Sequence, residues 1–129
     1  MGFMDKMKAA AKNADSKAGE EIDKSKYRSK IADEKRLIKE TYEKIGTAYY
    51  EGQKNGSIPE DDLINYCKQI DGSLAKIEEY EKKIVEIEEE AKAEREKNNA
   101  EAEQAAKERA EAKAAAKAEK AKTADDNEE

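Results

Sequence analysis

The decapeptide Glu51-Gly-Gln-Lys-Asn-Gly-Ser-Ile-Pro-Glu60 carries the strongest turn and helix-breaking signals in the chain. On either side of it, large aliphatic residues recur every seven positions, which places them on one stripe of a helix. Two such stripes joined by a short loop are best buried against each other. The sequence therefore predicts an all-α fold, an antiparallel two-helix coiled-coil hairpin spanning residues 27–90.

The expected hairpin seam combines these heptad rows with a companion position in the second arm, which Cys67 and Leu74 fill. A thiol on such a seam behaves as a small hydrophobic group. The complete expected seam is Ile31, Ile38, Ile45, Leu63, Cys67, Ile70, Leu74, Ile77 and Ile84. Most tyrosines follow the same stripes, which favours positions at the edge of the seam over stacking platforms for nucleic acid.

The second helix is expected to begin near Pro59. Ser57 and Glu60 have the spacing of a capping box, and Pro59 suits a first helical turn. The acidic residues that follow favour the positive end of the helix dipole. Because the heptad phase continues across Asp71-Gly72, we expect one helix with a weak point there rather than a second turn.

Residues 1–26 form an N-terminal segment in which residues 1–18 have the pattern of a short, basic, amphipathic helix. One interpretation is a first helix that packs against the hairpin or frays. The other is weak, reversible contact with an anionic membrane surface. The candidate membrane-contact residues are Phe3, Met4, Met7, Lys6, Lys8 and Lys12. Residues 19–26 are either a hinge or a helical continuation.

Residues 91–129 form a tail of strong helix formers, mainly Ala, Glu and Lys, without large apolar side chains. A helix without an apolar face has little to bury. We therefore expect the tail to be a solvated single helix or a disordered arm.

Composition excludes several function classes. The 129 residues include 45% charged residues, no His and one Cys, with a net charge of −6. The acidic balance argues against nucleic-acid binding, because phosphate recognition needs a basic face. Without His or paired Cys, we expect neither a metal site nor another cofactor, and no enzymatic activity. No run is apolar enough to span a membrane, and a lone thiol fits a cytoplasmic protein.

Three stretches carry a resemblance to a known family: Ile45-Gly-Thr-Ala-Tyr-Tyr-Glu51, Tyr66-Cys-Lys-Gln-Ile-Asp71 and Ile77-Glu-Glu-Tyr-Glu-Lys-Lys-Ile84. Over residues 27–90 the chain resembles short bacterial coiled-coil hairpin proteins that often end in a zinc ribbon. The resemblance implies the hairpin fold. No Cys-x-x-Cys pair follows residue 90, so the zinc site of that family is not expected in this chain.

A thin hairpin buries little apolar surface, so we expect it to need a second copy or another helical protein partner. The leading hypothesis is a non-catalytic, self-associating scaffold or adaptor in the cytoplasm, with residues 1–18 available to touch a membrane. The alternative is a secreted helical-hairpin effector or export substrate, because Tyr50-Glu51-Gly52 resembles the Trp-x-Gly turn of such proteins.

Overall fold

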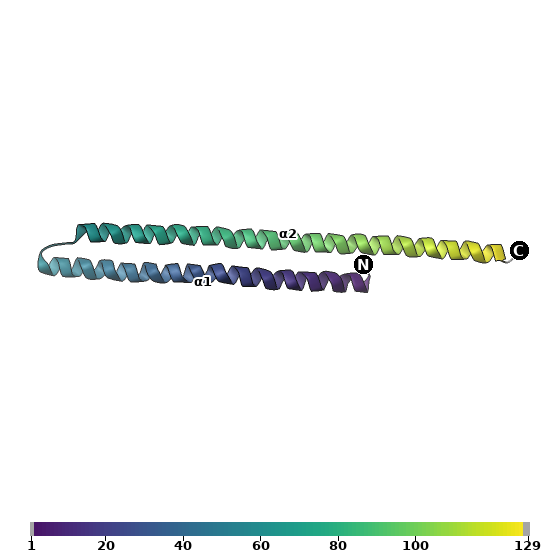
Figure 1. The fold of residues 1–129 in the computed structure, drawn as a ribbon, viewed down its shortest axis with the longest axis horizontal. Helices are drawn as coiled ribbons and strands as arrows, with labels where there is room; N and C mark the ends of the chain where they lie inside the picture. The colour runs from purple at the N-terminus through teal and green to yellow at the C-terminus, as the bar shows by residue number, and fades with distance from the viewer. Residues whose placement is uncertain (1, 128–129) are drawn as a thin grey trace. The chain divides into compact units, whose positions relative to one another are not determined.

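The computed structural model describes residues 2–127, which form two helices joined by one short loop. Helix α1 spans Phe3–Asn55 and helix α2 spans Glu60–Asn127 (Figure 1). The described residues contain no strand. The all-α helical hairpin predicted from the two heptad runs is therefore confirmed. Residues 19–26 continue α1, so the helical alternative holds and the hinge alternative does not.

The turn between the helices is a C-terminal glycine cap followed by a new helix start. Gly56 has a φ of +76°, the left-handed conformation that glycine adopts without a Cβ penalty. The Ser57 N–H donates to the Gly52 carbonyl oxygen at 2.9 Å, which is the long bond of a Schellman motif. Helix α2 begins at Glu60, and its first turn carries Asp61 and Asp62 as expected from the sequence.

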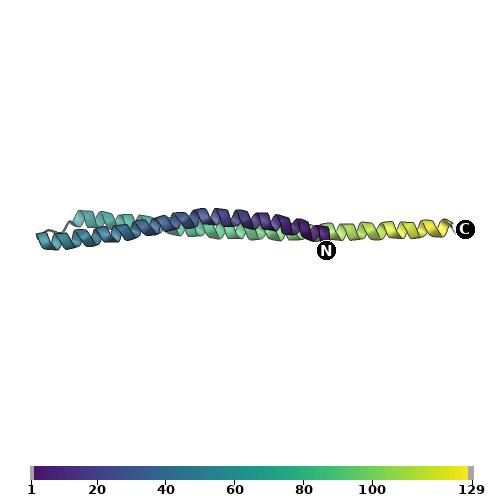
Figure 2. The same cartoon turned by 90° about the horizontal axis from the view of Figure 1, so that it is seen from below.

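The chain divides into two compact units. The hairpin unit comprises Glu20–Glu89, and the terminal unit combines Met1–Gly19 with Glu90–Glu129. In the hairpin unit, α1 and α2 run antiparallel and side by side, as both views show (Figures 1 and 2). The boundaries differ from the expected segments 1–26, 27–90 and 91–129, because residues 20–26 lie in the hairpin unit.

The seam of the hairpin unit contains the isoleucine rows. Ile70 and Ile77 are buried, and the other heptad residues are half-buried: Ile31, Ile38, Ile45, Leu63 and Ile84. The companion row of α2 is a different one from that expected. It consists of half-buried residues three positions after each heptad residue: Tyr66, Ser73, Tyr80 and Ile87.

Cys67 and Leu74 therefore do not belong to the seam, and the prediction for these two residues was wrong. Cys67 is exposed, and Leu74 retains 51% of its surface. Cys67 and Leu74 belong to a heptad row that continues with Glu81 and Glu88. A seam built on this row would therefore also bury these two carboxylates. Unpaired carboxylates are costly to bury. The alternative row instead covers two tyrosine rings and one isoleucine.

The terminal unit has a core of small and polar side chains. Its buried apolar residues among those described are Ala9, Ala91 and Ala102, and Asp5 is also buried. The Asn13 side-chain amide donates to Asn99 Oδ1 at 3.0 Å, and the Asn98 amide donates to Asn13 Oδ1 at 3.3 Å. The expectation that the tail lacks a packing partner is thus corrected for the alanine-lined part of α2.

Candidate functional site

Several large exposed apolar side chains of the hairpin unit lie on one flank, which we call the apolar face, and others, Leu37 among them, are exposed outside it. Its members are Tyr42 and Tyr49 on α1 and Ile64, Cys67 and Leu74 on α2. Each of the four large side chains retains at least half of its surface, with Tyr42 the most exposed at 59%. Contiguous apolar surface of this kind marks interaction sites on many proteins.

The position of the apolar face follows from its angular distance, around each helix, from a groove on the opposite flank of the hairpin unit. There, Leu37 and Lys44 of α1 line one groove together with Gln69 and Lys76 of α2. On α1, Tyr42 and Tyr49 each follow one of these residues by five positions, about 140° around the helix. On α2, Cys67 and Leu74 each precede one by two positions, about 160° around the helix. Both pairs therefore lie on the flank away from the groove.

Two ion pairs across the hairpin unit give the level of each residue along it. Lys24 Nζ lies 3.2 Å from Glu88 Oε1, and Lys76 Nζ lies 3.8 Å from Glu34 Oε1. This register places Cys67 level with Lys44, between the two tyrosines of α1. The apolar face then spans roughly the levels of residues 37–49, about 18 Å at 1.5 Å per residue.

The Lys24 cluster is the strongest electrostatic feature of the hairpin unit. Besides Glu88, its ammonium group lies 3.4 Å from Glu21 and 3.9 Å from Glu20. The hydrogen bond to Glu88 raises the pKa of Lys24, and the Lys24 charge lowers the pKa of Glu21. A buried ammonium held by carboxylates from both helices holds the hairpin in one register.

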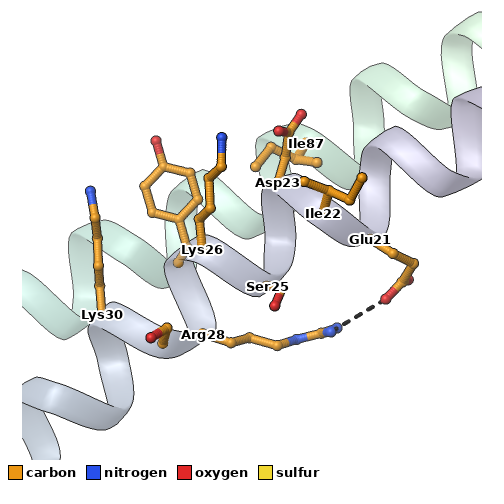
Figure 3. A pocket seen from close by; sticks show the side chains of 10 residues that line it. Glu21, Ile22, Asp23, Ser25, Lys26, Arg28, Lys30 and Ile87 are labelled. Atoms are coloured by element: carbon orange, nitrogen blue, oxygen red, sulfur yellow. Dashed lines mark hydrogen bonds and ion pairs between the residues drawn. The ribbon is translucent and has the colours of Figure 1, made fainter.

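The surface beside this cluster is shallow and chemically mixed. Figure 3 shows its side chains spread along α1, with Ile87 contributed by α2 and Arg28 paired to Glu21 at 3.4 Å. The lining includes acids, bases and hydroxyl groups that do not converge on a common point. Among the side chains that the structure describes, those of residues 2–122, no three acidic or thiol groups gather as metal ligands would. We therefore read this surface as a solvated helix flank.

The candidate membrane-contact residues lie on the outer side of the terminal unit. Phe3, Met4 and Met7 are all exposed, with Phe3 retaining 77% of its surface. Asp5 points the other way, because it is buried and its carboxylate lies 3.1 Å from Arg109. Lys6 and Lys8 are exposed, and Lys12 pairs with Glu101 at 3.8 Å while retaining 60% side-chain exposure. The outward surface is thus apolar with a basic border.

In the described part of the chain, neither helix contains a stretch both long and apolar enough to cross a membrane. Comparison with protein-family models, with curated proteins and with solved structures gives no match. The resemblance to bacterial hairpin proteins that often end in a zinc ribbon therefore stays a prediction.

Proposed function

We propose that the protein is a non-catalytic coiled-coil scaffold or adaptor that self-associates through its hairpin unit. The observation that carries this proposal is that few large apolar side chains are buried and many are exposed to solvent. The buried apolar residues in the described part are Ile70, Ile77 and three alanines, whereas three of the six tyrosines and several large aliphatic residues remain exposed. A second copy covering that exposed surface would stabilise both chains.

The non-catalytic part of the proposal is supported by residue chemistry. The chain has no His to move protons near neutral pH, and its one thiol, Cys67, is exposed on a helix. The chain therefore lacks the imidazole that commonly activates a thiol nucleophile. Exposed helical surface instead suits a protein that brings other molecules together.

Sedimentation equilibrium of the full chain tests self-association. We expect a mass of at least twice 14.5 kDa at micromolar concentrations, with dissociation on dilution. A folded monomer across the micromolar range would contradict the proposal. Circular dichroism of the same samples shows whether the chain is helical, so that a monomeric mass can be assigned to a folded protein.

A second candidate function is reversible binding to an anionic membrane surface through the terminal unit. It is favoured by the outward position of Phe3, Met4 and Met7, together with the burial of Asp5. Three bulky side chains provide only weak attachment, so lysines contribute by attraction to anionic lipid headgroups. Turning Asp5 inward removes an acidic charge that would oppose this attraction.

Co-sedimentation with vesicles containing phosphatidylserine tests the membrane proposal. We expect binding that falls as salt rises and that is lost in the triple variant Phe3→Ser, Met4→Ser and Met7→Ser. The matched control is Leu37→Ser, which removes an exposed apolar side chain from the hairpin unit and should leave binding unchanged. With neutral vesicles, we expect no more of the native chain to sediment than without vesicles. If anionic vesicles also fail to increase the sedimented fraction, the proposal is contradicted.

A further inference from the structure

We propose that the occupant of the apolar face is a second copy of this chain, arranged with both hairpin loops at the same end. In this arrangement α1 of one protomer packs on α2 of its partner, and the reverse contact is made across a two-fold axis parallel to the hairpin. The inference rests on the proposed self-association and adds the surface and the orientation.

The apolar area is of the right order for such an interface. The four large side chains of the face, each at least half exposed, present on the order of 400 Å² together. A standard-size interface buries about 800 Å² on each partner. The aliphatic stems of neighbouring lysines on α1 extend the apolar surface beyond these side chains.

The charges beside the face are separated by helix. On α1 the positions that border it carry Lys35 and Lys39, and on α2 they carry Asp71, Glu78 and Glu81, with Lys68 one turn beyond Ile64. Lys35, Lys39, Asp71 and Glu81 form no ion pair within residues 2–122, whereas Glu78 pairs with Lys82 at 3.6 Å. The α1 edge of the face is therefore basic and the α2 edge mainly acidic, and Lys35, Lys39, Asp71 and Glu81 are free to meet a second molecule.

This separation selects between the two symmetric ways of pairing identical faces. If the loops point in opposite directions, α1 lies on α1 of the partner and α2 on α2, so the opposite charges are not brought together. If the loops lie at the same end, the basic edge of each chain lies along the acidic edge of the other. Isologous pairing then satisfies both edges at once.

The register of the hairpin makes specific pairs. Asp71 lies level with Glu40, one residue from Lys39, and Glu78 lies level with Asp33, two residues from Lys35. With the loops at the same end, equal levels face each other across the interface. Lys39 then meets Asp71 of the partner subunit, and Lys35 meets Glu78 of the partner subunit. These contacts add to the burial of the apolar residues between them.

A matched pair of leucines tests the surface. Leu74 on the face and Leu37 on the opposite groove are similarly exposed, at 51% and 44%, and lie at the same level of the hairpin. We expect Leu74→Glu to raise the dimer dissociation constant by about tenfold or more and Leu37→Glu to leave it nearly unchanged. Both variants should remain helical, because neither side chain is buried.

Charge reversal tests the pairing of edges. We expect Lys35→Glu with Lys39→Glu to weaken the dimer, and Asp71→Lys with Glu78→Lys to do the same, because each leaves like charges facing. Mixing the two double variants should restore association as a heterodimer. If the substitutions only destabilised each chain, mixing the two double variants would not restore association.

Spin labels in the loop test the orientation. In a Ser57→Cys, Cys67→Ser chain, labels should lie close together when the loops share one end. With loops at opposite ends they should be separated by about 40 Å, since the loop lies about 20 Å from the centre of the face.

The possible outcomes separate the two proposals. A native chain that stays monomeric overturns both self-association and this arrangement. If the native chain is a dimer, three results would each overturn the arrangement alone. They are a dimer that persists in Leu74→Glu, no heterodimer from the two charge-reversed variants, and a label distance of about 40 Å.

Discussion

Replacing Gly52 by alanine tests the packing of the turn. An alanine Cβ at this position would lie 2.8 Å from the Ser57 carbonyl oxygen and 2.9 Å from Ile58 Cα. Both are backbone atoms, and Pro59 Cδ would lie 3.1 Å from the same Cβ. The loop cannot yield by turning a side chain, so the backbone that closes the hairpin must move. Movement also weakens the hydrogen bond from Ser57 N–H to the Gly52 carbonyl oxygen.

The expected magnitude is the difference between two opposing effects. Overpacking a close contact costs about 1–3 kcal/mol. Alanine in a helix gains about 0.5–1 kcal/mol over glycine, because it loses less backbone freedom on folding. We therefore expect Gly52→Ala to lower the free energy of unfolding by about 1–2 kcal/mol.

Gly72→Ala provides the matched control. Gly72 also lies within a helix, but nothing comes within 4 Å of a Cβ built there. This variant should therefore raise the free energy of unfolding by about 0.5–1 kcal/mol. Urea unfolding followed by circular dichroism, at one protein concentration for all three chains, measures both values. A Gly52→Ala chain as stable as the native chain would refute the steric reasoning.

Three further outcomes are expected in the same two units. In Lys24→Met, the Glu21 pKa should rise toward its ordinary value of 4.5, because Lys24 is the main cause of its lowered pKa; carboxyl titration by NMR measures this. A lowered pKa stabilises the fold above pH 4.5, so the native chain should lose this contribution as pH falls below that value, and Lys24→Met should lose less. Hydrogen exchange should be faster at residues 9–16 and 91–105 than at residues 31–48 and 63–84, because the terminal unit buries alanine beside half-buried asparagine, where the hairpin unit buries isoleucine. Glu34→Leu should raise the free energy of unfolding by about 1 kcal/mol, because Glu34 Oε2 is buried without a hydrogen-bond partner; no change in chemical unfolding would contradict this.

The hairpin and its turn could be predicted because their signals are local and redundant. The two isoleucine rows repeat by seven, and Gly56 and Pro59 interrupt the pattern in between. Helix propensity, periodicity and turn chemistry agree at these positions, which is the condition for a reliable prediction. The sequence does not decide whether α1 continues through Gly19, because one glycine weakens a helix but need not end it.

The companion row could not be assigned from residue size alone. Positions three and four after a heptad residue lie almost equally near the seam, and Cys67 and Leu74 are more apolar than Ser73. The decision depends on whole rows, since Glu81 and Glu88 accompany Cys67 and Leu74. The apolar face was missed for the same reason. Its signal was the step of seven between Tyr42 and Tyr49 and between Cys67 and Leu74.

Polar contacts between the two helices determine which register α1 and α2 adopt. Sliding one helix by seven residues would still place isoleucine beside isoleucine, so the apolar rows distinguish poorly between registers. The same slide would separate Lys24 from Glu88 and Asn13 from Asn98 and Asn99. It would also stretch a loop whose Ser57 N–H is bonded to Gly52. Apolar burial therefore supplies cohesion in several registers, and these polar contacts and the tight turn favour one of them.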